Sequence, residues 1–402
     1  MSQKAAIIGG GITGLSLAYF LLKKGIKAEI FEKEDHLGGL LATFRIENSF
    51  LEKFYHHFFV QDSAAFDLFE ELGIENRLYW VYPRMEFYSG GRTYSFTTPI
   101  DLLRFKPLSF IERLKFGLFS LKVKQQKQWL PLEEISAKEW LVENLGENVY
   151  KKLWQPMLRG KFGSFADKIP ASFVWFRIKA RSQTRGRFGL REKLGYLKGS
   201  YQVLLQALVN RILEMGGEIK LNSGSSALPL SGYDFTIVTT PNARSFPDIK
   251  YLGNICLILK LKKRFSDFYW TNVGDENIPF CAVVEHTNAF DDKGYNQFKI
   301  LYVSNYLEHG HSFWGMSDKE VFDKYTAGLK KINPEFLSED VVEYFVFKDK
   351  FAQPIPTLGH SKKIPPFKVE DRLYYVSNAQ IYPEDRGVSD SIRLACKFVK
   401  QL

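Results

Sequence analysis

Six residues near the start of the chain have the types and the spacing of a phosphate-binding turn. The sequence Gly9-Gly10-Gly11-Ile12-Thr13-Gly14 has glycine at its first, third and sixth positions, and Glu32 follows 18 residues after Gly14. Glycine at these positions permits a tight turn, close approach of the backbone to a pyrophosphate, and close packing of a helix on a strand. A glutamate at that distance can accept hydrogen bonds from ribose hydroxyls. The pattern predicts a dinucleotide-binding site, and Glu32 does not decide between NAD and FAD.

The elements that this turn requires stand on both sides of it. Lys4–Ile8 is a short apolar run typical of a buried strand, and Ile12–Lys24 carries apolar residues at helical spacing. Lys27–Glu32 alternates as a second strand does. The chain therefore opens with strand, helix and strand. The free N–H groups and the positive dipole end of the helix favour a bound phosphate.

A glycine doublet, Gly38-Gly39, follows six residues after Glu32. This arrangement resembles the family of FAD-containing amine oxidases, protoporphyrinogen oxidases and phytoene-type desaturases, in which the doublet lies along the flavin side of the pyrophosphate. That family often has arginine two residues before the doublet and just after it, where this chain has His36 and Leu40. The resemblance implies FAD as the cofactor, bound by Gly9, Gly11, Ile12, Thr13, Gly14, Glu32, Lys33, Gly38, Gly39 and Leu40.

Two later stretches resemble the same family. The tail, Leu373–Asn378 and then Tyr382–Val388, is similar to the family's closing strand, loop and helix. The helix near Val388 would direct its positive end at the N1 and O2 edge of the flavin. In the middle of the chain, the helix Tyr201–Met215 and the strand Phe235–Pro241 resemble the family's return to the FAD domain. These stretches imply cofactor contacts by Ser225, Thr240, Asn378, Gly387 and Val388.

The resemblance also implies residues on the substrate side. The run Glu52–His57 occupies the place where the family passes beside the isoalloxazine. In flavin-dependent sugar mutases an equivalent run carries a histidine that matches His56, and histidine carries protons near neutral pH. The alternative is that His56 only packs or hydrogen-bonds beside the ring. Tyr55 is its neighbour on the substrate side, and Arg159 and Lys161 either hold an anionic group of the substrate or are surface charges.

Positive charge is concentrated in two regions. The whole chain has a formal charge of +10, whereas residues 102–130 alone carry a net +6 and residues 151–200 a net +11. These regions predict contact with an anionic small molecule or with an anionic membrane surface. Nucleic acid is not expected, because no nucleic-acid-binding motif accompanies the charge. The simpler alternative is a solvated basic helical surface.

Composition and cysteine count limit the class of protein. With 45% apolar and 25% charged residues, the 402-residue chain has the composition of a globular protein. Its three cysteines, Cys256, Cys281 and Cys396, are too scattered for a disulfide framework and fit a reducing compartment. His309-Gly310-His311 has no companion ligands, so no metal is expected. No spanning segment is predicted. We expect a cytoplasmic protein with peripheral contact at the inner membrane surface.

Together these features predict an α/β fold with a discontinuous, Rossmann-type FAD-binding domain over residues 1–60, 195–245 and 365–402. Residues 61–194, mainly helical, and residues 246–364, an antiparallel sheet, are expected to form a second, α+β substrate domain. The predicted function is an FAD-dependent oxidoreductase that removes hydride from a C–N or C–C bond of an amphipathic or anionic substrate. Two alternatives remain: an isomerase that uses reduced FAD as the sugar mutases do, and a membrane-surface flavoprotein with lipid-binding basic helices.

Overall fold

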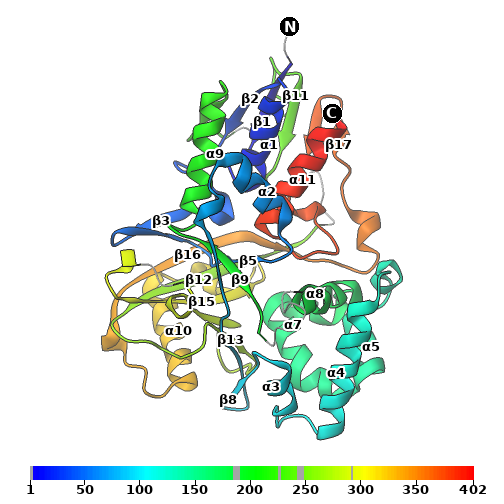
Figure 1. Cartoon of the computed structure of the whole chain (residues 1–402), viewed down its shortest axis with the longest axis vertical. Coiled ribbons are helices and arrows are strands. Elements are labelled where there is room, and N and C mark those ends of the chain that lie inside the picture. Colours follow the sequence, from blue (N-terminus) through cyan, green and yellow to red (C-terminus); the bar gives the residue numbers. More distant parts are fainter. Residues whose placement is uncertain (1–2, 184–190, 225–227, 242–248, 291–292) are drawn as a thin grey trace.

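A six-stranded sheet forms one end of the molecule (Figure 1). The computed structural model describes residues 3–183, 191–224, 228–241, 249–290 and 293–402. Neighbouring strands of this sheet are parallel, except for the last pair, which is antiparallel. The strand order is β10 (Glu218–Lys220), β2 (Lys27–Phe31), β1 (Lys4–Ile8), β11 (Phe235–Val238), β18 (Leu373–Tyr375) and β17 (Lys368–Glu370).

Helix α1 (Ile12–Lys23) lies on this sheet and packs against two helices from remote parts of the chain, α9 (Gln202–Glu214) and α11 (Val388–Gln401). It is buried along most of its length, which explains why its sequence is apolar on nearly every side. Helix α2 (Ser63–Leu72) packs against α9 and α11. This arrangement confirms the predicted α/β fold class with a parallel, Rossmann-type sheet.

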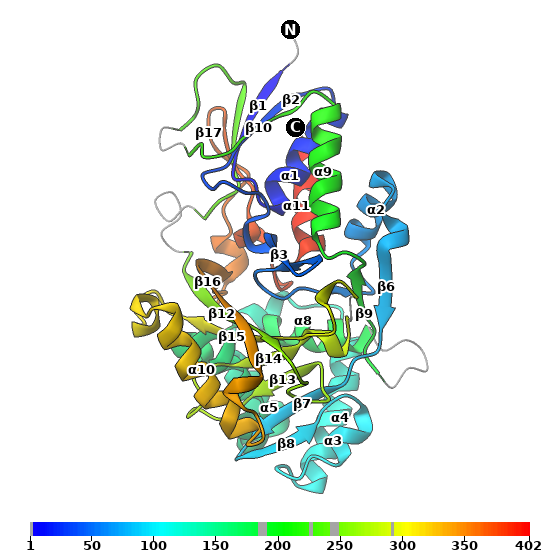
Figure 2. The ribbon, with the colours of Figure 1, turned by 90° about the vertical axis from the view of Figure 1, so that its left-hand side faces the viewer.

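A seven-stranded sheet, with α10 (Asp318–Ile332) packed on it, lies at the other end of the molecule (Figures 1 and 2). Its strand order is β16 (Val341–Pro354), β12 (Tyr251–Leu261), β15 (Lys299–Leu307), β14 (Ala282–Glu285), β13 (Trp270–Val273), β7 (Met85–Ser89) and β8 (Arg92–Ser95). The antiparallel sheet expected over residues 246–364 is confirmed, because β12 to β16 pair only in antiparallel fashion with one another, and β7, from outside this range, joins β13 in parallel. The mainly helical interpretation of residues 61–194 missed three strands, β6 (Leu78–Val81), β7 and β8; β6 pairs with the distant β9 (Leu194–Leu197) and β7 with the distant β13, whereas β8 pairs with its neighbour β7.

The remaining part of this end is a helical layer with an apolar core of its own. Three of its helices begin with a capping box, which satisfies free N–H groups of the first turn. The helices are α3 (Pro99–Leu103), α4 (Phe110–Gln125), α5 (Ala137–Leu145), α6 (Glu147–Val149), α7 (Gln155–Phe162) and α8 (Ala171–Gln183). Tyr150–Trp154, between α6 and α7, forms a turn of π-helix.

Short strands connect the two ends. β3 (Thr43–Ile46) and β4 (Ser49–Glu52) form a hairpin, and β5 (Phe58–Phe59), β9 (Leu194–Leu197) and β6 (Leu78–Val81) form a three-stranded sheet. All four residues of β9 are buried, although the basic stretch around them suggests a loop. In the described residues, no helix combines the length and the apolar character needed to cross a membrane.

Candidate active site

The glycine turn after β1 has a shape that only glycine fits. Gly9 has a φ of 112°, in the left-handed region. A Cβ atom on Gly14 would lie 1.9 Å from the carbonyl oxygen of Gly9, so any larger residue would push α1 away from the turn. The residue that precedes α1, Gly11, supplies no side-chain cap to the helix. The first N–H groups of α1, including those of Ile12 and Thr13, lack intrahelical partners and are left for a ligand.

Glu32 follows β2 and lies against this turn. It is buried, and its carboxylate accepts hydrogen bonds from the N–H groups of Gly10 at 2.6 Å and Glu34 at 3.0 Å. A carboxylate has about four acceptor positions, so capacity remains for ribose hydroxyls. Lys33 forms an exposed ion pair with Glu34 at 3.1 Å.

The glycine doublet reaches the same place. Gly38 is paired with Gly11 in an isolated bridge and donates its N–H to the carbonyl of Gly10 at 2.9 Å. Its φ is 112°, and a Cβ atom on it would lie 2.7 Å from the Cα of Ala42, so this position again requires glycine. A Cβ atom on Gly39 would touch the Cα of Gly11 at 3.4 Å. The doublet therefore lies directly against the start of α1.

The middle and the tail of the chain complete the arrangement. β11 pairs with β1, and a Cβ atom on Gly9 would lie 2.8 Å from Cγ2 of Thr240, which follows β11. β18 pairs with β11 and leads to Asn378, in a 3-10 turn that Ser377 caps. Ser225 lies outside the described residues. The structure thus brings the glycine turn, Thr240 and Asn378 to one edge of the sheet.

The N-terminus of α11 opens into a large cavity between this sheet and the other end of the molecule. Gly387 precedes the helix without a side-chain cap, and both it and Val388 line the cavity, whose volume is about 980 Å³. Leu40, Tyr55 and His56 line it as well. Aromatic and aliphatic side chains from several elements make up much of the remaining wall, among them Phe54, Phe59, Phe87, Phe96, Leu102, Leu114, Leu118, Leu121, Phe173 and Trp270.

His56 is neutral at ordinary pH. Burial, assisted by the charge of Arg386, lowers the pKa of His56 to about 4. Its Nδ1 lies 2.7 Å from the carbonyl oxygen of Phe54, and because a carbonyl only accepts, Nδ1 must carry the hydrogen. The other ring nitrogen, Nε2, then has a free lone pair and is an acceptor. Burial lowers the pKa of His57 to about 3 and raises that of Tyr55 well above its usual range, so all three residues are uncharged.

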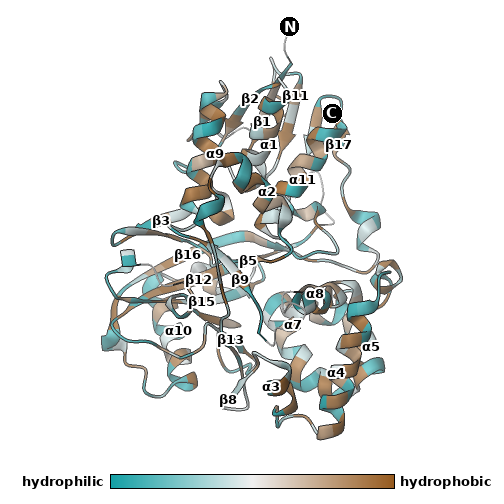
Figure 3. Ribbon diagram, viewed as in Figure 1, coloured by the Kyte–Doolittle hydropathy of each residue, from teal (hydrophilic) through white to brown (hydrophobic). Residues whose placement is uncertain are grey.

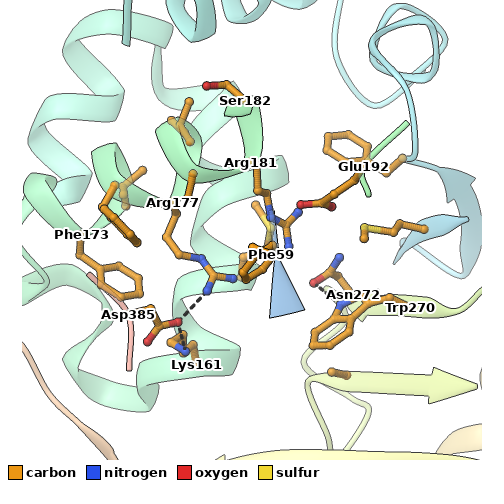
Figure 4. Close-up of a pocket in the computed structure, with 18 of the residues that line it drawn as sticks. Phe59, Lys161, Phe173, Arg177, Arg181, Ser182, Glu192, Trp270, Asn272 and Asp385 are labelled. Carbon is orange, nitrogen blue, oxygen red and sulfur yellow. Dashed lines mark hydrogen bonds and ion pairs between the residues drawn. The ribbon is translucent and has the colours of Figure 1, made fainter. Parts of the chain in front are cut away.

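A cluster of charges stands in the wall of the cavity opposite Trp270 and Asn272 (Figure 4). Lys161 on α7 and Arg177 on α8 both point toward Asp385, with N–O distances of 2.9 Å and 2.6 Å to the same carboxylate oxygen. Burial acts to raise the pKa of Asp385, but these two cations and Arg386 outweigh it and hold the pKa well below its usual range. Two cations on one carboxylate leave the cluster with a net positive charge.

Not all predicted residues come to the cavity. Lys161 does, whereas Arg159 forms an ion pair with Glu276 at the surface and does not line the cavity. Residues two apart on a helix point in different directions, which explains the difference. Arg177 and Asp385 are the residues that the sequence did not indicate. For Asp385 a signal existed, because it stands two residues before Gly387 in the tail that resembles the FAD-binding family.

The two histidines around Gly310 each form a hydrogen bond to the backbone and do not line the cavity. Nε2 of His309 bonds the carbonyl of Lys350 at 2.6 Å, and Nδ1 of His311 accepts from the N–H of Phe313. Among the described residues, no group of three or more histidine, cysteine or acidic side chains is placed to hold a metal ion.

Comparison with known proteins identifies the family. The family of flavin containing amine oxidoreductases matches residues 12–241, more than half of the chain. The chain belongs to the flavin-containing amine oxidoreductase family. FAD is accordingly its cofactor. The uncapped starts of α1 and α11, and the close contacts at Gly9 and Gly14, fit this cofactor.

A curated relative of this flavin-containing amine oxidoreductase is the 15-cis-phytoene desaturase of Synechococcus elongatus. The two are 30% identical over an alignment of 243 positions, which covers 55% of this chain and 50% of the relative. The match to this curated relative thus spans about half of the relative's length.

Two solved structures share the fold over the whole chain. A putative protoporphyrinogen oxidase from Exiguobacterium has a TM-score of 0.79 at 17% identity and matches 100% of this chain and 98% of that one. A reduced UDP-galactopyranose mutase has a TM-score of 0.75 at 14% identity, with 100% and 94% covered. At these identities the likeness shows the fold alone.

Proposed function

We propose that this flavoprotein removes a hydride from a C–C or C–N bond of an amphipathic substrate that carries an anionic group. The observation that carries the proposal is the cavity, which has a mainly apolar, aromatic wall and one cluster with net positive charge. When bound, FAD supplies a two-electron acceptor: hydride leaves one substrate carbon, a proton leaves the adjacent atom, a double bond forms, and oxygen or a quinone finally takes the electrons.

The cofactor contacts follow from the positions described above. The glycine turn and the start of α1 would hold the pyrophosphate, with Gly38 and Gly39 on its other side. Glu32 would accept from the ribose hydroxyls, and Thr240 and Asn378 would lie along the cofactor. Gly387 and Val388 would offer the positive end of α11 to the ring, where reduction places negative charge.

The side chains of the cavity have three tasks in this proposal. The aromatic wall excludes water and presents flat apolar surface to the body of the substrate. Lys161 and Arg177 bind its anionic group, and Asp385 holds the two cations together without cancelling their charge. His56, neutral and with Nε2 free to accept, is the candidate to take the proton that leaves beside the hydride.

The relatives support oxidation of a C–C bond in particular, because the curated relative named above is a desaturase. A lipophilic body fits the apolar and aromatic part of the wall, away from the residues assigned to the flavin. The basic cluster then adds a requirement for one negative group.

Anaerobic titration tests this proposal directly. Purified holoprotein is mixed with polyprenoids, porphyrinogens, amines and nucleotide sugars, with and without a carboxylate or phosphate group, and loss of the visible flavin absorbance is followed. An amphipathic anionic compound should reduce the flavin, and Lys161→Met should weaken its binding by about 2 kcal/mol, or about thirtyfold. The matched control is Lys168→Met, an exposed lysine outside the cavity. Reduction by small cationic amines alone would overturn the proposal.

A second candidate function is isomerisation with reduced FAD and no net oxidation. It is supported by the fold shared with the reduced UDP-galactopyranose mutase and by the position of His56 in the cavity. Such an enzyme would turn over nucleotide sugars only after reduction by dithionite and would consume no electron acceptor. Product formation by the oxidised protein, coupled to reduction of an acceptor, would eliminate this candidate.

A further inference from the structure

Helix α4 has apolar side chains on two opposite sides. One side, with Phe116, Phe119 and Val123, is buried in the core of the helical layer. The other side faces solvent, where Ile111 is 77% exposed and Leu118 is 69% exposed. We call the following exposed side chains of the two helices the α3–α4 face: Ile100, Leu103, Phe110, Ile111, Leu114, Leu118 and Leu121.

The exposed side of α4 has a regular pattern. Placed at about 100° per residue around the helix, its five apolar members fall within one arc of about 100°. Lys115 and Lys122 border this arc on one edge. Arg113 and Lys124 border it on the other. An apolar stripe between two rows of cations is the pattern of a helix that lies in a membrane interface.

The α3–α4 face is continuous with the mouth of the active-site cavity. Leu103, Leu114, Leu118 and Leu121 belong to the face and also line the cavity. Figure 3 shows hydrophobic segments on both helices, at the end of the molecule far from the six-stranded sheet. Exposed apolar surface of this extent marks a contact with a partner or with lipid.

We propose that the α3–α4 face docks on an anionic lipid bilayer, with the cavity mouth against the membrane. The stripe enters the boundary between headgroups and acyl chains, and the flanking cations meet the lipid phosphates. The net charge of +6 over residues 102–130 provides the complementarity that favours anionic lipid over a neutral surface. The proposed docking follows from the α3–α4 face alone and does not depend on the function of the cavity. Its role in delivering a lipophilic substrate to the cavity rests on the function proposed above.

Vesicle flotation tests the docking. Holoprotein should float with vesicles of phosphatidylglycerol and phosphatidylcholine at low salt, and much less with phosphatidylcholine alone. Phe110 and Ile111 belong to the face but do not line the cavity, so the double variant Phe110→Glu/Ile111→Glu tests the surface without touching the site. It should lower the partition coefficient at least about tenfold. The matched control is Leu213→Glu on α9, where Leu213 is 52% exposed and remote from the face.

Any outcome other than flotation of the wild type and weaker flotation of the double variant overturns the proposal. If the double variant floats as well as the wild type, the attraction is only electrostatic adhesion and the stripe does not insert. If the wild type does not float but is a dimer that the double variant converts to a monomer, a second copy of the chain covers the face. Failure of the proposed function is detected separately, because flavin reduction by a detergent-solubilised substrate should be the same in the double variant and the wild type.

Discussion

Glu52, a carboxyl group buried in the core, should make a contribution to the stability of this protein that falls as the pH rises. Its side chain is fully buried at the end of β4, and it accepts hydrogen bonds from the OH of Tyr196 and the N–H of Tyr201, each at 2.7 Å. Burial raises the pKa of Glu52 from 4.5 to about 7, against the opposing effect of these bonds. The folded protein therefore keeps the carboxyl protonated where the unfolded chain has lost the proton.

The sign and the size of the effect follow from linkage. A raised pKa in the folded state contributes stability that is fully present below pH 4.5 and is lost as the pH rises through about 7. The difference between the two pKa values corresponds to about 3 kcal/mol in the free energy of unfolding. In Glu52→Gln the amide reproduces the neutral acid, because Oε1 can accept from Tyr201 while Nε2 donates to the oxygen of Tyr196. The free energy of unfolding of Glu52→Gln should therefore not fall between pH 4.5 and 7 on account of this side chain.

Urea denaturation, followed by tryptophan fluorescence from pH 4.5 to 8, measures the effect. The free energy of unfolding of Glu52→Gln relative to that of the wild type should rise by about 3 kcal/mol across this range. The exposed Glu335→Gln serves as the control and should follow the wild type at every pH. A difference between Glu52→Gln and the wild type that stays constant with pH would refute the reasoning, because Glu52 would then be ionised in both states.

Three further predictions concern the cofactor and the cavity. In Gly14→Ala the new Cβ would lie 1.9 Å from the carbonyl oxygen of Gly9, so the variant should lose about 2 kcal/mol in the free energy of unfolding. It should also bind little flavin, which the ratio of visible to ultraviolet absorbance measures. The pKa of His56, near 4, predicts that the rate of flavin reduction measured by stopped flow shows no inflection from this group between pH 6 and 8, whereas an ordinary histidine pKa would produce one. Asp385→Asn removes the carboxylate between two cations and should lower the free energy of unfolding by about 3 kcal/mol, as measured by thermal denaturation. Sulfate, which can bind the two cations, should restore part of this stability. An unchanged melting temperature would show that the carboxylate does not hold Lys161 and Arg177 together.

The sequence predicted the parts of the site that depend on local chain geometry. The turn at Gly9, the glutamate at position 32 and the helix that starts at Val388 could be found because a tight turn or a helix start needs particular residue types at fixed spacing. Lys161 was indicated only by the resemblance of its stretch to a known family, and the structure places it in the cavity wall.

The rest depends on contacts between remote parts of the chain. Arg177 and Asp385 meet across 208 residues, and no local pattern records that meeting. The strands β7 and β8 were missed because each is short and their sheet is completed by β13, which lies far along the chain. The sequence showed that α4 is apolar and basic. It did not show which of the helix's two apolar sides is buried, so the exposed stripe could not be predicted.

The order of strands in the six-stranded sheet has a consequence for biosynthesis. β1, which lies between β2 and β11 in the sheet, is synthesised long before β18 and α11. Until α11 is synthesised, the side of α1 that packs against it stays exposed, and the residues proposed to contact the flavin ring, Gly387 and Val388, are missing. A nascent chain that has made the other end of the molecule but not yet α11 should therefore be able to fold that end without retaining FAD.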